Sequence, residues 1–167
     1  RGILLYHGLG VGKSCASIAI AESNKENRKV VILLQVSIKQ NYIGELMKCG
    51  DEYFKLNQHW VFVPCSSTQG RDKYLFALKI GITKSSISVN NGAFFIDFTK
   101  TSNFDSLSSI EREKIRLQIM KMIESKYDFK HTNGLTDKQL TKMEEERYFD
   151  NKLVIIDEVH NIINGMT

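Results

Sequence analysis

The residues whose types and spacing point most directly to chemistry form the stretch GLGVGKS, from Gly8 to Ser14. Its alternating glycines let the backbone turn inward, so that successive N–H groups point at one anion. Lys13 adds a positive charge that can reach the β- and γ-phosphates of a nucleotide, and the Ser14 hydroxyl can bind Mg²⁺. The stretch therefore predicts a phosphate-binding loop. The residues expected to contact the nucleotide are Gly8, Leu9, Gly10, Val11, Gly12, Lys13, Ser14 and Cys15.

The match to the general pattern of such loops, G-x-x-x-x-G-K-[ST], is incomplete. His7 stands where the pattern has its first glycine, whereas Gly12, Lys13 and Ser14 are in place. A tight turn followed by an ordinary helix cap is the structural alternative. The apolar run before the glycines and the helical spacing after them favour the phosphate-binding loop, because the N-terminus of a helix attracts anions.

A second chemical feature is the acidic pair Asp157-Glu158, which closes the apolar run KLVIID. Asp157 is expected to hold Mg²⁺ together with Ser14, and Glu158 to act as general base on the water that attacks the γ-phosphate. A solvated acidic turn is the alternative for an isolated pair of this kind. With the loop upstream, the pair predicts a site for nucleotide hydrolysis in which Lys13 and Glu158 are catalytic.

The elements that must position these residues alternate between apolar runs and segments of helical spacing. Strands are predicted at Gly2–Tyr6, Lys29–Gln35, Trp60–Pro64, Ala93–Phe98 and Lys152–Asp157, helices at Lys13–Asn24, Ser37–Met47, Ser109–Tyr127 and Asp137–Phe149, and a loop at Lys126–Asn133. Ser37 is expected to cap its helix and Gly50 to end it. The alternation predicts an α/β fold with a mostly parallel, doubly wound sheet.

The middle of the chain offers two further patterns. Four apolar residues of the segment 109–127 share one helical face, and its charged residues occupy the rest. These apolar residues are Ile115, Ile119, Met122 and Ile123. A solvated charged face is the simpler interpretation, and a face turned to nucleic acid is the alternative. Phe94, Phe95 and Phe98 are predicted to lie in a core rather than to stack on bases.

Composition sets broad limits on the class of protein. The 167 residues suffice for about one domain with a core, and the net charge of +4 permits contact with nucleic acid without requiring it. The three cysteines have no metal-ligand spacing and are predicted to be free thiols in a reducing compartment. The sequence shows no apolar run near ~20 residues and no signal peptide. Because Gly2 already lies in a predicted strand, we expect a piece of a longer protein.

These motifs resemble the first RecA-like domain of superfamily-two helicases and translocases, above all helicase-like proteins of large nucleocytoplasmic DNA viruses. Gly10, Gly12, Lys13 and Ser14 match the family's motif I, and Asp157, Glu158 and His160 match its DExH box. The resemblance implies a three-layer RecA-like P-loop NTPase fold and the cofactors ATP and Mg²⁺. Residues 1–167 would form a partial first lobe with an insertion at about 69–148, and the second lobe would lie elsewhere in the parent chain.

The family's motif Ia, which contacts the sugar-phosphate backbone, corresponds here to the segment after the second predicted strand. Gln35 replaces the usual proline, but Ser37, Lys39 and Asn41 are donors near a helix N-terminus. The resemblance implies that these three contact nucleic acid. A plain helix cap is the alternative.

Several functions fit these features. The first is the ATP-binding lobe of a nucleic-acid-dependent ATPase, a helicase or translocase acting on DNA rather than RNA. Alternatives are a viral transcription-associated ATPase without strand separation, a P-loop kinase or nucleotide-binding switch, and a non-hydrolysing interaction module. Expected partners are nucleic acid, the second lobe and viral RNA polymerase, in the host cytoplasm or the virion, with no membrane. Because the second lobe supplies the family's arginine finger, the chain alone should hydrolyse ATP weakly.

Overall fold

The computed structural model describes residues 2–5, 12–24, 28–132 and 136–157. The chain divides into two compact units. Unit 1 comprises Arg1–Gly50 and Lys126–Thr167, and unit 2 comprises Asp51–Ser125. The expected insertion at about 69–148 stays a prediction, because the division into two units does not show whether either unit is an insertion in a larger domain.

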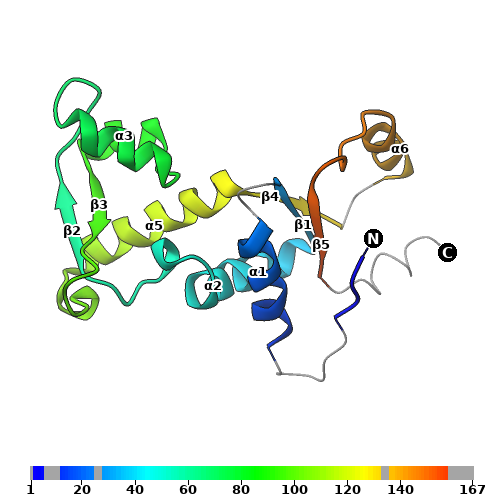
Figure 1. Cartoon of the computed structure of the whole chain (residues 1–167), viewed down its shortest axis with the longest axis horizontal. Coiled ribbons are helices and arrows are strands. Elements are labelled where there is room, and N and C mark those ends of the chain that lie inside the picture. The colour runs from blue at the N-terminus through cyan, green and yellow to red at the C-terminus, as the bar shows by residue number, and fades with distance from the viewer. Residues whose placement is uncertain (1, 6–11, 25–27, 133–135, 158–167) are drawn as a thin grey trace. The chain divides into compact units, whose positions relative to one another are not determined.

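Unit 1 is built on a parallel sheet of three strands in the order β4-β1-β5 (Figure 1). The strands are β1 (Val30–Leu34), β4 (Tyr127–His131) and β5 (Leu153–Ile156). Val30 is in register with Tyr127 on one side and with Leu153 on the other. All five residues of β1 are buried, as its continuous apolar run predicts for a strand covered on both faces. Together with its helices, this sheet confirms the α/β class.

Two helices of unit 1 pack against each other, α1 (Lys13–Asn24) and α2 (Lys39–Cys49), and α1 also lies against β5. Both helices were expected, but the start of α2 differs. Ser37 lies in the short 3₁₀ helix η1 (Val36–Ile38), and no side chain caps α2, so the prediction that Ser37 is its cap is wrong. Gly50 does end α2, where its N–H donates to the Leu46 carbonyl at 3.0 Å.

The first predicted strand is not formed within the described residues. Gly2–Leu5 carries no strand assignment, and Ile3 and Leu4 are 79% and 76% exposed. An apolar run becomes a strand only where a neighbour supplies its hydrogen bonds, and none of the described strands pairs with this segment. Tyr6 lies outside the described residues.

The return to the sheet in unit 1 also differs from expectation. The segment Lys126–Asn133 was predicted to be a loop, but Tyr127–His131 forms β4. The helix predicted at Asp137–Phe149 is α6 (Asp137–Glu145), which begins with a capping box between Thr136 and Gln139. It ends before Phe149, because Arg147 has a φ of 51° and cannot continue a right-handed helix.

Unit 2 contains an antiparallel pair of strands, β2 (Trp60–Val63) and β3 (Ala93–Ile96). Its helices are α3 (Arg71–Lys79), α4 (Lys84–Asn90) and α5 (Ser109–Lys126, whose last residue belongs to unit 1), with 3₁₀ turns η2 (Glu52–Phe54) and η3 (Phe104–Ser106). The expectation that Trp60–Pro64 extends the parallel sheet is therefore wrong. An apolar run specifies a strand without specifying which strand it will pair with.

The helix α5 has the buried face that its periodicity predicts. Ile115, Ile119, Met122 and Ile123 are at most 1% exposed. Gln118 is buried beside them, and its side-chain amide pairs with the backbone of Phe94 in β3. The amide nitrogen donates to the Phe94 carbonyl at 2.9 Å, and the amide oxygen accepts from the Phe94 N–H at 3.0 Å.

Two of the three phenylalanines around β3 lie in the core, as expected. Phe94 and Phe95 are buried, whereas Phe98 is 55% exposed, so its assignment to the core is wrong. Phe98 follows the end of β3, where the Asp97 carboxylate accepts from the Thr99 N–H at 3.1 Å and turns the chain away.

Among the described helices, none combines the length and the apolar character needed to cross a membrane.

The bidentate contact of Gln118 should be a major determinant of the stability of unit 2. Replacing Gln118 with Ala leaves both backbone groups of Phe94 buried without partners, which should lower the free energy of unfolding by about 2 kcal/mol or more. Urea unfolding followed by circular dichroism measures the change. The exposed Lys114 on the same helix provides the control, since Lys114→Ala should change stability by less than about 0.5 kcal/mol. Equal stability of the two variants would contradict this role.

Candidate nucleotide site

The site is organised by the carboxyl edge of the parallel sheet in unit 1. Leu33 of β1 is in register with Ile156 of β5, and the N–H of Asp157 donates to the Leu33 carbonyl at 3.0 Å. This bond places Asp157 immediately after β5 at the carboxyl edge. In open α/β sheets, ligands bind beyond the carboxyl ends of the strands. Asp157 therefore lies where a carboxylate can act on a bound ligand.

The other half of the predicted site is the start of α1. Gly12 has a φ of +79°, and its carbonyl accepts from the Ala16 N–H at 3.0 Å as the helix begins. A positive φ suits glycine and strains other residues, which explains why glycine stands directly before Lys13. Lys13, Ser14 and Cys15 form the first turn of α1, where free N–H groups favour anions. Gly8, Leu9, Gly10 and Val11 lie outside the described residues, as do Glu158 and His160.

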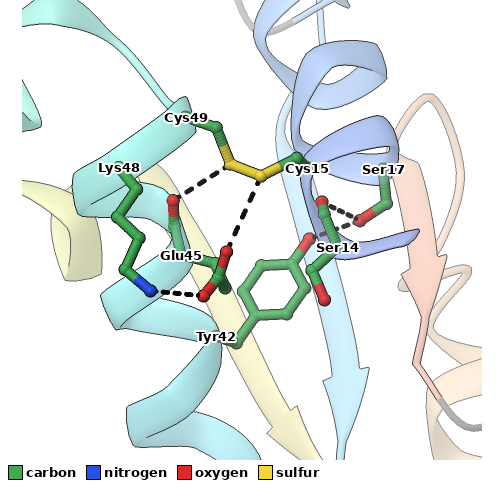
Figure 2. The surroundings of a disulfide bond; sticks show 7 residues. All are labelled: Ser14, Cys15, Ser17, Tyr42, Glu45, Lys48 and Cys49. Carbon is green, nitrogen blue, oxygen red and sulfur yellow. Dashed lines mark hydrogen bonds and ion pairs between the residues drawn. A yellow bond between two sulfur atoms is a disulfide. The ribbon is translucent and has the colours of Figure 1, made fainter. Parts of the chain in front are cut away.

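A hydrogen-bonded relay connects the first turn of α1 to α2. The Ser17 hydroxyl donates to the Ser14 carbonyl at 2.8 Å and lies 3.0 Å from the Tyr42 hydroxyl (Figure 2). Because the single proton of Ser17 is used on Ser14, the Tyr42 hydroxyl must be the donor to Ser17. The relay therefore requires Tyr42 to keep its proton.

The pKa of Tyr42 reflects its burial, its hydrogen bond and the charge of Asp157. Burial raises the pKa of Tyr42 to about 12, the hydrogen bond with Ser17 opposes this rise, and the charge of Asp157 adds to it. Since α1 packs against both α2 and β5, the helices that carry Ser14 and Tyr42 and the strand that precedes Asp157 belong to one packed group.

The cysteines next to this region differ from expectation. Cys15 and Cys49 form a disulfide with their Cα atoms 5.7 Å apart, joining the first turn of α1 to the last residue of α2 (Figure 2). The prediction of free thiols is wrong for this pair and confirmed for Cys65, which is free and buried. The partners are 34 positions apart in the sequence, so no local pattern indicated the pairing. Glu45 lies beside it, with its carboxylate 3.6 Å from the Cys15 sulfur.

The residues expected to contact nucleic acid follow the carboxyl end of β1. Ser37 is exposed in η1, and Asn41 is exposed on the first turn of α2. The Lys39 ammonium lies 5.3 Å from the centre of the Phe129 ring of β4. In the sequence, these three residues therefore follow the end of β1 at the same edge of the sheet that carries Asp157. Their contact with a nucleic acid stays a prediction.

Sequence reasoning missed one residue at this edge, His131. It is in register with Leu34 at the carboxyl end of β4, and the next residue, Thr132, donates its N–H to the Leu34 carbonyl at 2.9 Å. Among the described side chains, the Nδ1 atom of His131 is buried without a hydrogen-bond partner. Because β4 was interpreted as a loop, its terminal residue could not be placed beside the site.

Comparisons with known proteins point to one group of viral proteins. No family model matches the chain, and no solved structure matches it. "Putative ATP-dependent RNA helicase L377" of Acanthamoeba polyphaga mimivirus is 31% identical over 169 aligned residues, which cover 97% of this chain and 14% of that protein. "Putative ATP-dependent RNA helicase R563" of the same virus is 40% identical over 55 residues, or 32% of this chain and 10% of that protein.

The chain is therefore similar in sequence to viral proteins that carry helicase names. It spans about one seventh of L377, at 14% of its length. The relationship agrees with the helicase resemblance of the sequence motifs. The DExH subtype is not addressed by these names and stays a prediction.

The relay through Tyr42 predicts a specific dependence of stability on pH. The pKa of Tyr42 is about 12 in the folded protein and 10.0 for an ordinary tyrosine. The protonated phenol therefore contributes its full stabilisation of the fold below pH 10, and this stabilisation is lost as the pH rises through 12. The loss is roughly 3 kcal/mol at most. The Tyr42→Phe substitution should remove this part of the dependence of the free energy of unfolding on pH. Urea unfolding of both proteins between pH 9 and about pH 12 measures the difference, and parallel curves would contradict the assignment.

Proposed function

We propose that this chain is the ATP-binding and hydrolysing lobe of a nucleic-acid-dependent ATPase of the helicase type, with a RecA-like fold. The proposal is supported by the position of Asp157 directly after β5 at the carboxyl edge of the sheet, and by the packing of α1, whose first turn carries Lys13 and Ser14, against β5. The relatives named as ATP-dependent RNA helicases support it. A kinase or a passive interaction module lacks comparable support.

The described donors suit a magnesium nucleotide. The Ser14 hydroxyl and the Asp157 carboxylate offer hard oxygen ligands, which Mg²⁺ prefers, so these two residues would hold the ion. When bound, Mg²⁺ neutralises charge on the β- and γ-phosphates. The positive φ of Gly12 and the free amides at the start of α1 suit the phosphates themselves.

The protein's own residues then divide the reaction between them. The N-terminus of α1 and the Lys13 ammonium bind and orient the triphosphate, and Lys13 offsets its negative charge. Glu158 accepts the proton of the water that attacks the γ-phosphorus, which releases ADP and phosphate. Gly8 to Val11 would complete the cradle with backbone N–H groups. The isolated chain would turn over slowly, because the second lobe supplies further stabilising charge in the parent protein.

We propose RNA rather than DNA as the nucleic acid. The sequence favoured DNA, but both relatives carry names that specify RNA. Ser37, Lys39 and Asn41 follow the carboxyl end of β1 and offer hydroxyl, ammonium and amide donors, which suit phosphate and sugar oxygens. Contacts of this kind position a strand without reading its bases, so the proposal implies little sequence specificity.

Loss of the Lys13 charge should abolish tight nucleotide binding. Lys13→Ala should weaken binding of Mg²⁺-ATP to the parent protein by roughly 100-fold or more, or about 2.7 kcal/mol, because the phosphate charge loses its partner. Isothermal titration calorimetry measures the affinity. Lys138→Ala on the exposed face of α6 is the matched control and should bind as tightly as the unaltered protein. Unchanged affinity in a folded Lys13→Ala protein would exclude the loop assignment.

The single experiment that tests the whole proposal is ATP hydrolysis by the parent protein with and without nucleic acid. Single-stranded RNA should raise turnover about tenfold or more, DNA should raise it less, and Glu158→Gln should keep Mg²⁺-ATP binding while losing turnover by about 100-fold or more. Stimulation without unwinding of a labelled duplex would favour the transcription-associated ATPase. Turnover that ignores every nucleic acid would refute the motor function.

A further inference from the structure

The chemical feature that the proposed function leaves unused is the disulfide between Cys15 and Cys49. Cys15 directly follows Ser14, the proposed magnesium ligand, and Cys49 is the last residue of α2. The bond therefore joins the phosphate-binding turn of α1 to the end of a second helix. One residue later, after Gly50, the chain passes from unit 1 into unit 2.

The surroundings of the bond are polar and half-buried (Figure 2). The Glu45 carboxylate lies 3.6 Å from the Cys15 sulfur, and the Glu45 carbonyl oxygen lies 3.2 Å from the Cys49 sulfur. The Lys48 ammonium contacts the same carboxylate at 2.8 Å. Cys15 and Cys49 are both partly exposed residues, in contrast to Cys65, which is 3% exposed. We therefore expect a small thiol in solution to reach the pair.

We propose that Cys15 and Cys49 form a reversible thiol–disulfide site that regulates nucleotide binding in the same unit, an inference that rests on the proposed function. In the reducing direction, a thiolate of the glutathione class attacks one sulfur and forms a mixed disulfide, and a second such thiol releases it. The protein disulfide gains two electrons and two protons to give two thiols, and the small thiols leave as their own disulfide.

The direction of the effect follows from what else holds α1 against α2. Without the covalent bond, the hydrogen bonds from Tyr42 to Ser17 and from Ser17 to Ser14 still connect α2 to the first turn of α1. Reduction leaves this turn free to sample arrangements in which Ser14 does not face the nucleotide. Binding must then restore the order, so the reduced protein binds nucleotide more weakly than the oxidised one.

Glu45 influences the rate of the exchange. Its negative charge beside the Cys15 sulfur repels an incoming thiolate, although Lys48 compensates part of this charge. Glu45→Gln should therefore be reduced by dithiothreitol faster than the unaltered protein, by roughly two- to fivefold. Equal rates would exclude the proposed influence of Glu45. The measurement needs no nucleotide and so does not depend on the proposed function.

The regulation is tested by equilibrating the parent protein in glutathione buffers of graded composition. Peptide mapping should find the Cys15 and Cys49 peptides linked in oxidising buffer and separate in reducing buffer. Titration with Mg²⁺-ADP should give an affinity roughly three- to tenfold weaker after reduction and restored on reoxidation. Cys49→Ser should bind at the reduced level in both buffers, and Cys65→Ser should respond like the unaltered protein.

The outcomes separate this inference from the proposed function. Absence of the linked peptides at every glutathione ratio would refute the thiol–disulfide site. Linked peptides with equal nucleotide affinity in both states would refute the regulation alone. Normal formation of the pair without nucleotide binding in either state would refute the proposed function and the regulation with it.

Discussion

The parallel hydrogen-bond ladder of β1 with its two neighbours is the constraint on which the candidate site depends. The ladder brings Leu34, His131 and Asp157 to one edge, through the pairs Leu34–His131 and Leu33–Ile156 and the bond from Asp157 to Leu33. A slip of one residue would turn each side chain of β5 to the opposite face of the sheet. The register of the ladder therefore determines which side chains meet at this edge.

The edge alone does not make a site, since the first turn of α1 must also be held in place. Among the described residues, the disulfide and the relay through Tyr42 connect this turn to α2. They differ in what can break them. Removal of the Tyr42 proton needs a pH near its raised pKa of about 12, so the relay is constant under physiological conditions. The disulfide responds to thiols, and it is therefore the connection through which the environment can act.

Sequence patterns identified the elements whose signal is local. The periodicity of α5 and the continuous apolar run of β1 were sufficient, because burial of one face or of both faces determines each pattern. The same reasoning failed where a partner decides the outcome, as at Gly2–Leu5 and Trp60–Pro64. It also failed at β4, whose charged residues indicated a loop. In the structure Lys130 lies 3.3 Å from Asp128, and Asp128 accepts from the Tyr148 hydroxyl, so these charges pair with each other and with a partner outside the sheet.

The candidate site shows the same division between local and distant information. The residue types at positions 12 to 15 and at 157 indicated phosphate and magnesium chemistry without any structure. The disulfide and His131 could not be found in this way, because each depends on segments that are distant in the chain.

Unit 2, with its own core around Phe54 and Ile115, occupies the chain between α2 and β4. Since the cost of closing a loop grows slowly with its length, such a segment can be accommodated provided that its two ends are fixed. One end is fixed beside Cys49 by the disulfide and the other by the pairing of Tyr127 with Val30, so the fixed ends preserve the geometry of unit 1 whatever lies between them.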